Sequence, residues 1–260
     1  THTLGHYSMW QELSKIVPAP PTAFDSIVCR APSTAESLRE GFLWLQEMHG
    51  LKGRDLPCRL DVTGFGIDLE LFHPHSEDEK SRARRVLNLP QNGQIAMYFG
   101  RVTPHSKADL MPLLRAFCDA TQNDDDYLLI AGTPYPETYA QQLRETGNAL
   151  GLGERLIIHG HVEPQLRPLY FGAADVFVFP ADNIVETWGN TMCEAMASAL
   201  PVIASDWDGL STHMKNGENG FLIPTWWMPG TERVELFSPY APKRGDRLRL
   251  AQNVWVDTVA

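Results

Sequence analysis

The sequence predicts an α/β protein with a doubly wound parallel sheet. Apolar runs of strand length alternate with segments of helical periodicity, and turn residues separate them. The runs lie near residues 95, 127, 156, 176, 202 and 221. Ligands of such sheets bind beyond the carboxyl ends of the strands, so the residues that follow each run are the candidates for function.

Composition narrows the class of protein. The 260 residues are 43% hydrophobic, which is enough for a core, and carry a formal net charge of −10, which argues against a nucleic-acid partner. No apolar run approaches the roughly 18 residues of a membrane-spanning helix. The four cysteines are scattered without a CxxC pair, which predicts a reducing, cytoplasmic setting.

The N-terminal part predicts two short strands around a helix. A strand is expected over 26–32, and a capping box of Ser33 and Glu36 is expected to begin the helix that follows. A second strand is expected over 60–63, and Gly64 permits a sharp change of direction after it.

Two cations follow the strand expected over 95–98. Arg101 ends this run, and Lys107 lies six residues later, just before a segment with helical periodicity. At the carboxyl edge of a parallel sheet, two cations beside a helix N-terminus suit a diphosphate. The alternative is that both are solvated surface cations, as most arginines and lysines are.

Two groups of residues contain side chains that can bind a metal ion, but neither group predicts a metal site. Residues 123–126 form an acidic cluster before a strand, which is typical of a solvated turn. His159 and His161 share a face by period two, but no third ligand of matching kind lies nearby. GxGxxG, P-loop, GxSxG and HExxH strings are absent, which excludes the commoner dinucleotide, NTPase, hydrolase and zinc-protease classes.

The segment with the most candidate functional residues holds two glutamates, Glu186 and Glu194, with seven residues between them. A helix is expected from about Thr191 to Ala199, followed by a buried strand over 202–204. Glu186 then stands just before the helix and Glu194 one turn inside it, where the positive end of the helix dipole attracts anions. The structural alternative is a capping box in which Glu194 bonds back to the backbone near Thr191.

The string ETWGNTMCEAMASALPVIASDWDGL resembles the retaining glycosyltransferases of the GT-B fold, specifically the large family 4 that includes sucrose-phosphate synthases and many mannosyl- and glucosyltransferases. The resemblance implies that Glu186 is catalytic at the donor sugar, and that Glu194 hydrogen-bonds the nucleotide ribose. Donor binding is also implied for the residues between them: Thr187, Trp188, Gly189 and Asn190.

The same resemblance assigns the other site residues. Arg101 and Lys107 would contact the donor phosphates, although the family's usual separation is five residues rather than six. Backbone groups near Val162 would read the nucleotide base, and His2, in His-Thr-Leu-Gly, would face the donor sugar as a catalytic residue. Family members often carry Gly-Gly where this chain has Asp-Gly at 208–209, which puts sugar contacts at that turn in doubt.

The resemblance also sets the expected domain organisation. GFGIDLELFHP, from Gly64 to Pro74, resembles the family's interdomain crossing. Residues 1–66 would be the C-terminal remnant of the N-terminal, acceptor-side domain, and residues 67–260 a Rossmann-like donor-binding domain. Truncation at both ends is expected, because the chain starts without methionine and stops within a helical pattern over 250–260. The Trp-Trp pair at 226–227 is assigned to no element.

The expected reaction is transfer of a hexose from a nucleotide-diphosphate sugar to a sugar, lipid or protein acceptor. The resemblance implies retained anomeric configuration, with no metal and no cofactor. Two alternatives stay open. One is a non-catalytic nucleotide-sugar binding or regulatory module, and the other is another GT-B enzyme, such as a sugar phosphorylase or a nucleotide-sugar epimerase.

Overall fold

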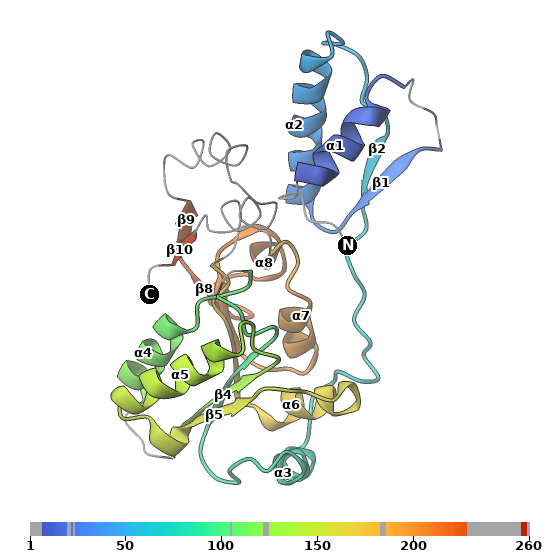
Figure 1. Ribbon diagram of the computed structural model, residues 1–260. Coiled ribbons are helices and arrows are strands. Elements are labelled where there is room, and N and C mark those ends of the chain that lie inside the picture. The colour runs from blue at the N-terminus through green and yellow to red at the C-terminus, as the bar shows by residue number, and fades with distance from the viewer. Residues whose placement is uncertain are drawn as a thin grey trace. The chain divides into compact units, whose positions relative to one another are not determined.

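The computed structural model describes residues 7–19, 22, 24–104, 106–121, 125–182, 186–227 and 256–258 (Figure 1). The chain forms two compact units. The first unit comprises Thr1–Gly66, Ile184–Trp188 and Pro229–Val254, and the second comprises Ile67–Asn183, Gly189–Met228 and Trp255–Ala260. The assignment of 1–66 to an acceptor-side domain and of 67–260 to a donor-binding domain stays a prediction.

The first unit contains two parallel strands and two helices: α1 Tyr7–Ile16, β1 Ser26–Cys29, α2 Pro32–Met48 and β2 Arg59–Val62. Its small core centres on Val17, Phe42, Leu45 and Cys58. The predicted capping box at Ser33 is wrong, because α2 begins at Pro32 with Ala31 as N-cap and no side-chain cap. Ala31 has no side-chain acceptor, and the fixed φ of Pro32 suits the first helical position, so the helix begins there without a side-chain cap.

The second unit is built on a parallel sheet of six strands, which confirms the predicted fold class. The strands are β3 Ile95–Phe99, β4 Tyr127–Ala131, β5 Leu156–His159, β6 Val176–Phe179, β7 Val202–Ser205 and β8 Phe221–Ile223. Their spatial order is β5-β4-β3-β6-β7-β8. The chain therefore builds outward from β3 in one direction and from β6 in the other, and the adjacent pair β3 and β6 forms the topological switch point.

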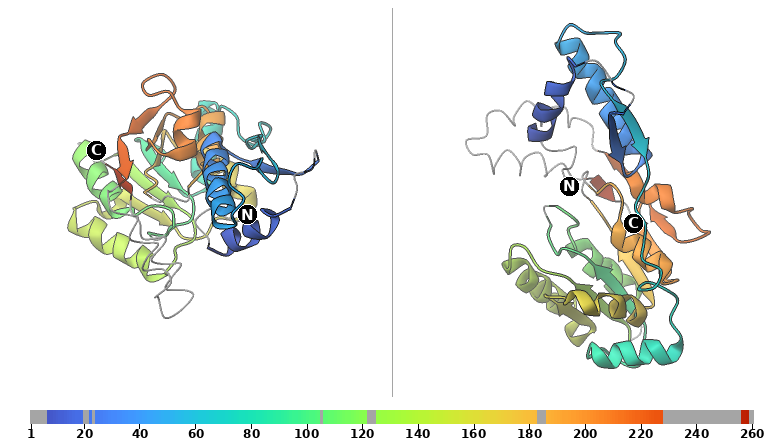
Figure 2. Two further views of the ribbon diagram at one scale, coloured as in Figure 1. Left: turned by 90° about the horizontal axis from the view of Figure 1, so that it is seen from above. Right: turned by 90° about the vertical axis from the view of Figure 1, so that its right-hand side faces the viewer.

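The helices of this unit are α3 Glu77–Val86, α4 Met111–Ala120, α5 Thr138–Ala149, α6 Arg167–Ala173, α7 Asn190–Ala197 and α8 Asp208–His213. Short 3₁₀ turns, η1 Gly153–Arg155 and η2 Pro164–Leu166, precede β5 and α6. Right-handed crossovers place α4 and α5 on one face and α7 and α8 on the other (Figure 2). None of the described helices is long and apolar enough to cross a bilayer.

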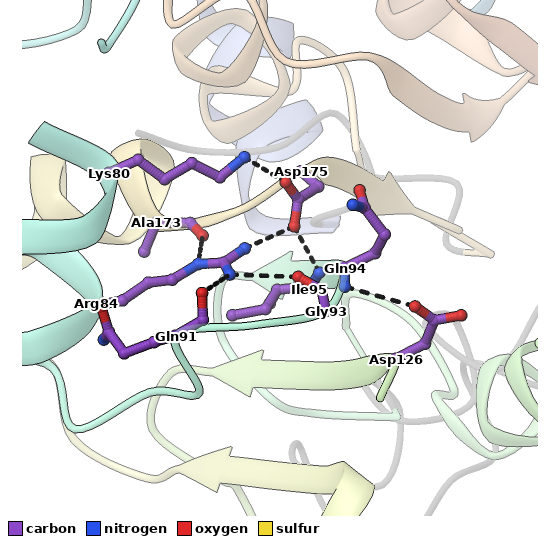
Figure 3. A network of polar contacts seen from close by, with 9 residues as sticks. All are labelled: Lys80, Arg84, Gln91, Gly93, Gln94, Ile95, Asp126, Ala173 and Asp175. Atoms are coloured by element: carbon purple, nitrogen blue, oxygen red, sulfur yellow. Dashed lines mark hydrogen bonds and ion pairs between the residues drawn. The ribbon is translucent and has the colours of Figure 1, made fainter. Parts of the chain in front are cut away.

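The amino-terminal edge of the sheet is tied to α3 by a buried ion-pair network, shown in Figure 3. The Asp175 carboxylate accepts hydrogen bonds from Lys80, from Arg84 at 2.6 Å and from the backbone N–H of Ile95 at 2.6 Å. Arg84 also donates to three backbone carbonyls, those of Ala173, Gln91 and Gly93. We call Lys80, Arg84 and Asp175 the amino-edge clamp.

Two local predictions near the C-terminus are corrected. The segment left unassigned around the Trp-Trp pair forms β9, Thr225–Trp227, which pairs antiparallel with β10, Val256–Thr258. The helical pattern expected over 250–260 is therefore wrong at 256–258, because ladder hydrogen bonds to β9 outweigh local periodicity, and 250–255 lie outside the described residues. The turn expected at 208–209 is instead the start of α8, where Asp208 has a left-handed φ of 45°.

Candidate functional site

The loop after β3 carries the two predicted phosphate-binding cations. Arg101 is exposed and Lys107 half-buried. The loop is fixed from inside the fold, because the Tyr98 hydroxyl donates to the Arg101 carbonyl at 2.9 Å and the Val102 N–H donates to the Thr133 carbonyl at 3.1 Å. The exit from β4 passes so close that a Cβ on Gly132 would lie 1.7 Å from the Gly100 carbonyl oxygen. The sequence at this turn thus requires glycine for backbone packing.

Two aspartates that the sequence analysis missed join this loop to the loop after β6. Asp182 accepts a hydrogen bond from the Asp109 backbone N–H at 2.9 Å. The Tyr139 hydroxyl donates to the Asp109 carboxylate at 2.8 Å and accepts from the Leu110 N–H at 2.7 Å. Burial, reinforced by the charge of Asp109, raises the pKa of Asp182 to about 7. We call Asp109, Tyr139 and Asp182 the carboxyl-edge network.

The loop after β6 leads into α7 through a left-handed turn. Gly189 is the N-cap of α7, with φ 74°, and a Cβ there would lie 2.4 Å from Leu210. Only glycine combines that backbone conformation with that approach. Asn190, the first helical residue, is exposed, and the first backbone N–H groups of a helix have no partner within the helix itself.

Glu194 lies within α7 and is held by Arg167, the first residue of α6. One guanidinium nitrogen of Arg167 donates to both carboxylate oxygens, at 2.6 and 2.5 Å. Burial raises the pKa of Glu194, and the charge and hydrogen bonds of Arg167 oppose that rise. The capping-box alternative is therefore wrong: α7 has no side-chain cap, and the Glu194 carboxylate bonds a distant arginine instead of its own helix terminus.

Sequence reasoning missed Arg167 because nothing local marks it. It stands in an ordinary helix start, 27 residues before Glu194 in the sequence. Its guanidinium lies 5.5 Å from the ring centroid of Phe99 and 5.9 Å from that of Phe72. The cation thus packs against aromatic faces, a placement that only the tertiary structure could reveal.

Glu186, Thr187 and Trp188 are assigned to the first unit, where each can be described by itself. Glu186 is buried and Thr187 half-buried. The Trp188 ring lies edge-on to Phe65 with centroids 6.4 Å apart, and a Cβ on Gly64 would lie 2.7 Å from it. Gly64 has φ 68°, so the expected change of direction after β2 is present, and it leaves room for this indole.

Val162 follows β5 and is half-buried against the main core, and its role in reading the nucleotide base stays a prediction. The two histidines before it do not converge on a metal. His159 bonds the Tyr170 hydroxyl at 2.9 Å, and His161 contacts Glu163 at 3.2 Å on the surface. The described part of the chain contains no group of three or more residues suited to hold a metal ion. His2 lies outside the described residues.

Comparison with curated proteins identifies similar sequences. The D-inositol 3-phosphate glycosyltransferase of Thermomonospora curvata is 31% identical over 201 residues, which are 74% of this chain and 44% of that protein. The protein of the same name from Mycolicibacterium smegmatis is 31% identical over 210 residues, covering 77% of this chain and 45% of that protein. The chain thus spans less than half the length of these relatives.

Solved structures share the fold. HepE of Anabaena, in complex with UDP and glucose, superimposes with a TM-score of 0.64 at 19% identity, covering 94% of this chain and 61% of that one. Sucrose-phosphate synthase of Thermosynechococcus elongatus gives a TM-score of 0.60 at 23% identity, covering 96% and 58%. Residues 93–227, which hold the whole six-stranded sheet, match the glycosyl transferases group 1 family. The chain belongs to that family.

Proposed function

We propose that the protein transfers a hexose from a nucleotide-diphosphate sugar to an acceptor, with retained anomeric configuration. One observation carries the proposal. Arg101, Lys107 and the N-terminus of α7 all follow the carboxyl ends of β3 and β6, the adjacent strands at which the sheet order reverses. That switch point is where doubly wound sheets bind their ligands.

The phosphate-binding part of the site would consist of the two cations and the helix terminus. Charge-assisted hydrogen bonds to a phosphate contribute roughly 1.5–3 kcal/mol each. Negative charge grows on the diphosphate as the bond to the sugar breaks, so these groups would stabilise the transition state more than the ground state. Because they already supply positive charge, we propose that transfer needs no metal ion.

The sugar and nucleoside would lie on either side of this diphosphate. Glu186 would orient the donor sugar, with His2 as a second catalytic residue and 187–190 lining the donor. Glu194 would accept hydrogen bonds from the ribose, and the loop at Val162 would read the base. HepE has been solved with UDP-glucose, which supports UDP as the first nucleotide to test. The four free cysteines are consistent with the reducing, cytoplasmic setting that belongs to this proposal.

The test combines donor binding with turnover. UDP-, GDP- and ADP-hexoses are offered with D-inositol 3-phosphate and with sugar, lipid and protein acceptors, and release of nucleoside diphosphate and the anomeric form of the product are measured with and without a chelator. We expect Glu186→Gln to lower kcat by about a hundredfold and to change donor Kd little. Equal losses in kcat and in donor affinity would contradict the catalytic role of Glu186.

The same assay separates the alternatives. Donor binding without transfer to any acceptor, also in the full-length protein, would favour the non-catalytic module. Turnover that depends on inorganic phosphate would favour a phosphorylase, and conversion of the donor without an acceptor would favour an epimerase. Transfer with inverted configuration, or transfer abolished by the chelator and restored by a divalent cation, would overturn the corresponding part of the proposal.

A further inference from the structure

Among the described residues, the carboxylate of Glu194 is held by hydrogen bonds from one side. In the part of the chain that the structure describes, its hydrogen-bond donor is a single nitrogen of Arg167, which is shared between both oxygens. An ionised carboxylate can accept about four hydrogen bonds. Each oxygen therefore keeps a lone pair that Arg167 does not use, although the side chain is only 10% exposed.

The arginine itself is positioned by contacts other than the ion pair. Its guanidinium packs near Phe99 and Phe72, and its Nε is buried without a hydrogen-bond acceptor among the described residues. Leaving a buried donor unsatisfied is unfavourable. A cation held at this cost, beside a carboxylate with spare acceptor capacity, is better explained by ligand binding than by stabilisation of the fold.

We propose that Arg167 is a positioning residue that turns the Glu194 carboxylate so that its remaining lone pairs accept hydrogen bonds from the two ribose hydroxyls of the nucleotide. The inference rests on the proposed function, since it deepens the nucleoside end of that site. Arg167 acts through Glu194 rather than on the reacting atoms. With the Glu194 carboxylate held in this orientation, the site should bind a ribonucleotide more tightly than nucleotides that lack the 2′- or the 3′-hydroxyl.

The experiment measures Kd by calorimetry for UDP, 2′-deoxy-UDP and 3′-deoxy-UDP, with the wild-type protein and four variants. In Arg167→Gln we expect UDP affinity to fall about tenfold while affinity for the two deoxynucleotides changes by less than about threefold. Glu194→Gln should show the same loss of discrimination. Arg167→Lys keeps the charge but not the planar guanidinium, so it should restore discrimination only in part.

The matched control is Arg115→Gln, which removes a surface arginine whose partner, Asp119, lies one turn away on α4. It should bind all three nucleotides as the wild type does. Should Arg167→Gln fail to fold, Arg167→Lys decides the matter, because unchanged discrimination in that variant overturns the role of Arg167.

The outcomes separate this inference from the proposed function. If the wild type binds none of the nucleotides, both are overturned. If the wild type prefers UDP and Glu194→Gln loses that preference while Arg167→Gln retains it, the ribose site stands and the inference about Arg167 is wrong. Loss of the preference in both variants, with the control unchanged, supports the inference.

Discussion

Two arginine–carboxylate pairs among the described residues of the second unit, one buried and one partly exposed, differ in how completely their hydrogen-bonding groups are satisfied. In the amino-edge clamp, Asp175 is bound by two cations and a backbone N–H, and Arg84 donates to three carbonyls as well as to Asp175 (Figure 3). At the opposite edge, Glu194 is bound through one nitrogen of Arg167, whose Nε is buried without an acceptor among the described residues. The first pair completes the fold, and the second keeps capacity for a ligand.

The two arginines also differ in the exposed fraction of their side chains. The side chain of Arg84 is 4% exposed and that of Arg167 37%. A charge sealed from water must have all its partners inside the protein, because an unpaired buried charge is very costly. A partly exposed arginine can donate some of its hydrogen bonds to water or to a bound molecule. The two pairs should therefore respond differently when one partner is removed.

The largest effect is expected from breaking the amino-edge clamp. Asp175→Asn should lower the free energy of unfolding by about 3–5 kcal/mol, because Arg84 and Lys80 would be left as buried cations without a counter-charge. Arg167→Gln should cost less, about 1–2 kcal/mol, because Arg167 is partly solvated and the Glu194 carboxyl, whose pKa burial already raises, can take up a proton instead of remaining an unpaired charge. Urea unfolding followed by circular dichroism checks both values. Equal losses in the two variants would end the distinction drawn between the pairs.

A smaller, pH-dependent effect is expected in the carboxyl-edge network. The pKa of Asp182 is raised to about 7, mainly by burial, whereas an unfolded aspartate titrates near about 3.9. Between these values the native state holds a proton that the unfolded state has released. The contribution of Asp182 to the free energy of unfolding therefore falls as pH rises through this window, by up to roughly 1.4 kcal/mol per pH unit.

Removing the titrating group tests this sign. In Asp182→Asn, the free energy of unfolding should fall less steeply between about pH 4 and about pH 7 than it does in the wild type. Asp109→Asn should flatten the dependence in part, because the charge of Asp109 helps to raise the pKa of Asp182. Urea unfolding at a series of pH values gives both slopes. A slope in Asp182→Asn as steep as in the wild type would show that other groups carry the dependence.

The smallest effect concerns the helix that brings the clamp residues to the sheet. Ser76 caps α3, accepting from the Glu79 N–H while the Glu79 carboxylate accepts from the Ser76 N–H. Ser76→Ala should cost about 1 kcal/mol of stability. Because α3 lies at the edge opposite the proposed donor site, nucleotide affinity should stay unchanged. A parallel loss of UDP affinity in this variant would show that the two edges are coupled.

The fold and much of the candidate site could be predicted from local sequence because their signals are local. Apolar runs such as 127–131 are short and apolar throughout, which is the pattern of a buried strand and not of a surface helix. They form strands at the expected positions. The residues that follow these runs inherit their place at the carboxyl edge from the chain direction alone. Arg101, Lys107 and Val162 could therefore be assigned to that edge without any knowledge of tertiary contacts.

Predictions from local sequence were wrong where a side chain or a backbone segment could bond either a neighbour in the sequence or a distant part of the chain. The spacing of Glu194 from Thr191 matches a capping box, yet the Glu194 carboxylate bonds Arg167, because the guanidinium carries a full positive charge and a backbone N–H does not. Periodicity suggested a helix at 256–258, yet β9 supplies a partner strand. In both places the competing partner is distant in sequence, so no window of neighbouring residues contains it.

The sequence by itself determined the order of strands and helices, the edge at which we propose that ligands bind and the two glutamates that carry the family resemblance, because periodicity and spacing are properties of neighbouring residues. The tertiary structure alone decided which charges meet. Arg84 and Asp175 are 91 residues apart, Asp109 and Asp182 are 73 apart, and Arg167 and Glu194 are 27 apart. Chain folding brings these groups within hydrogen-bond distance. In the interior, where the dielectric constant is low, a completed hydrogen bond is stronger and an unpaired polar group is more costly than in water.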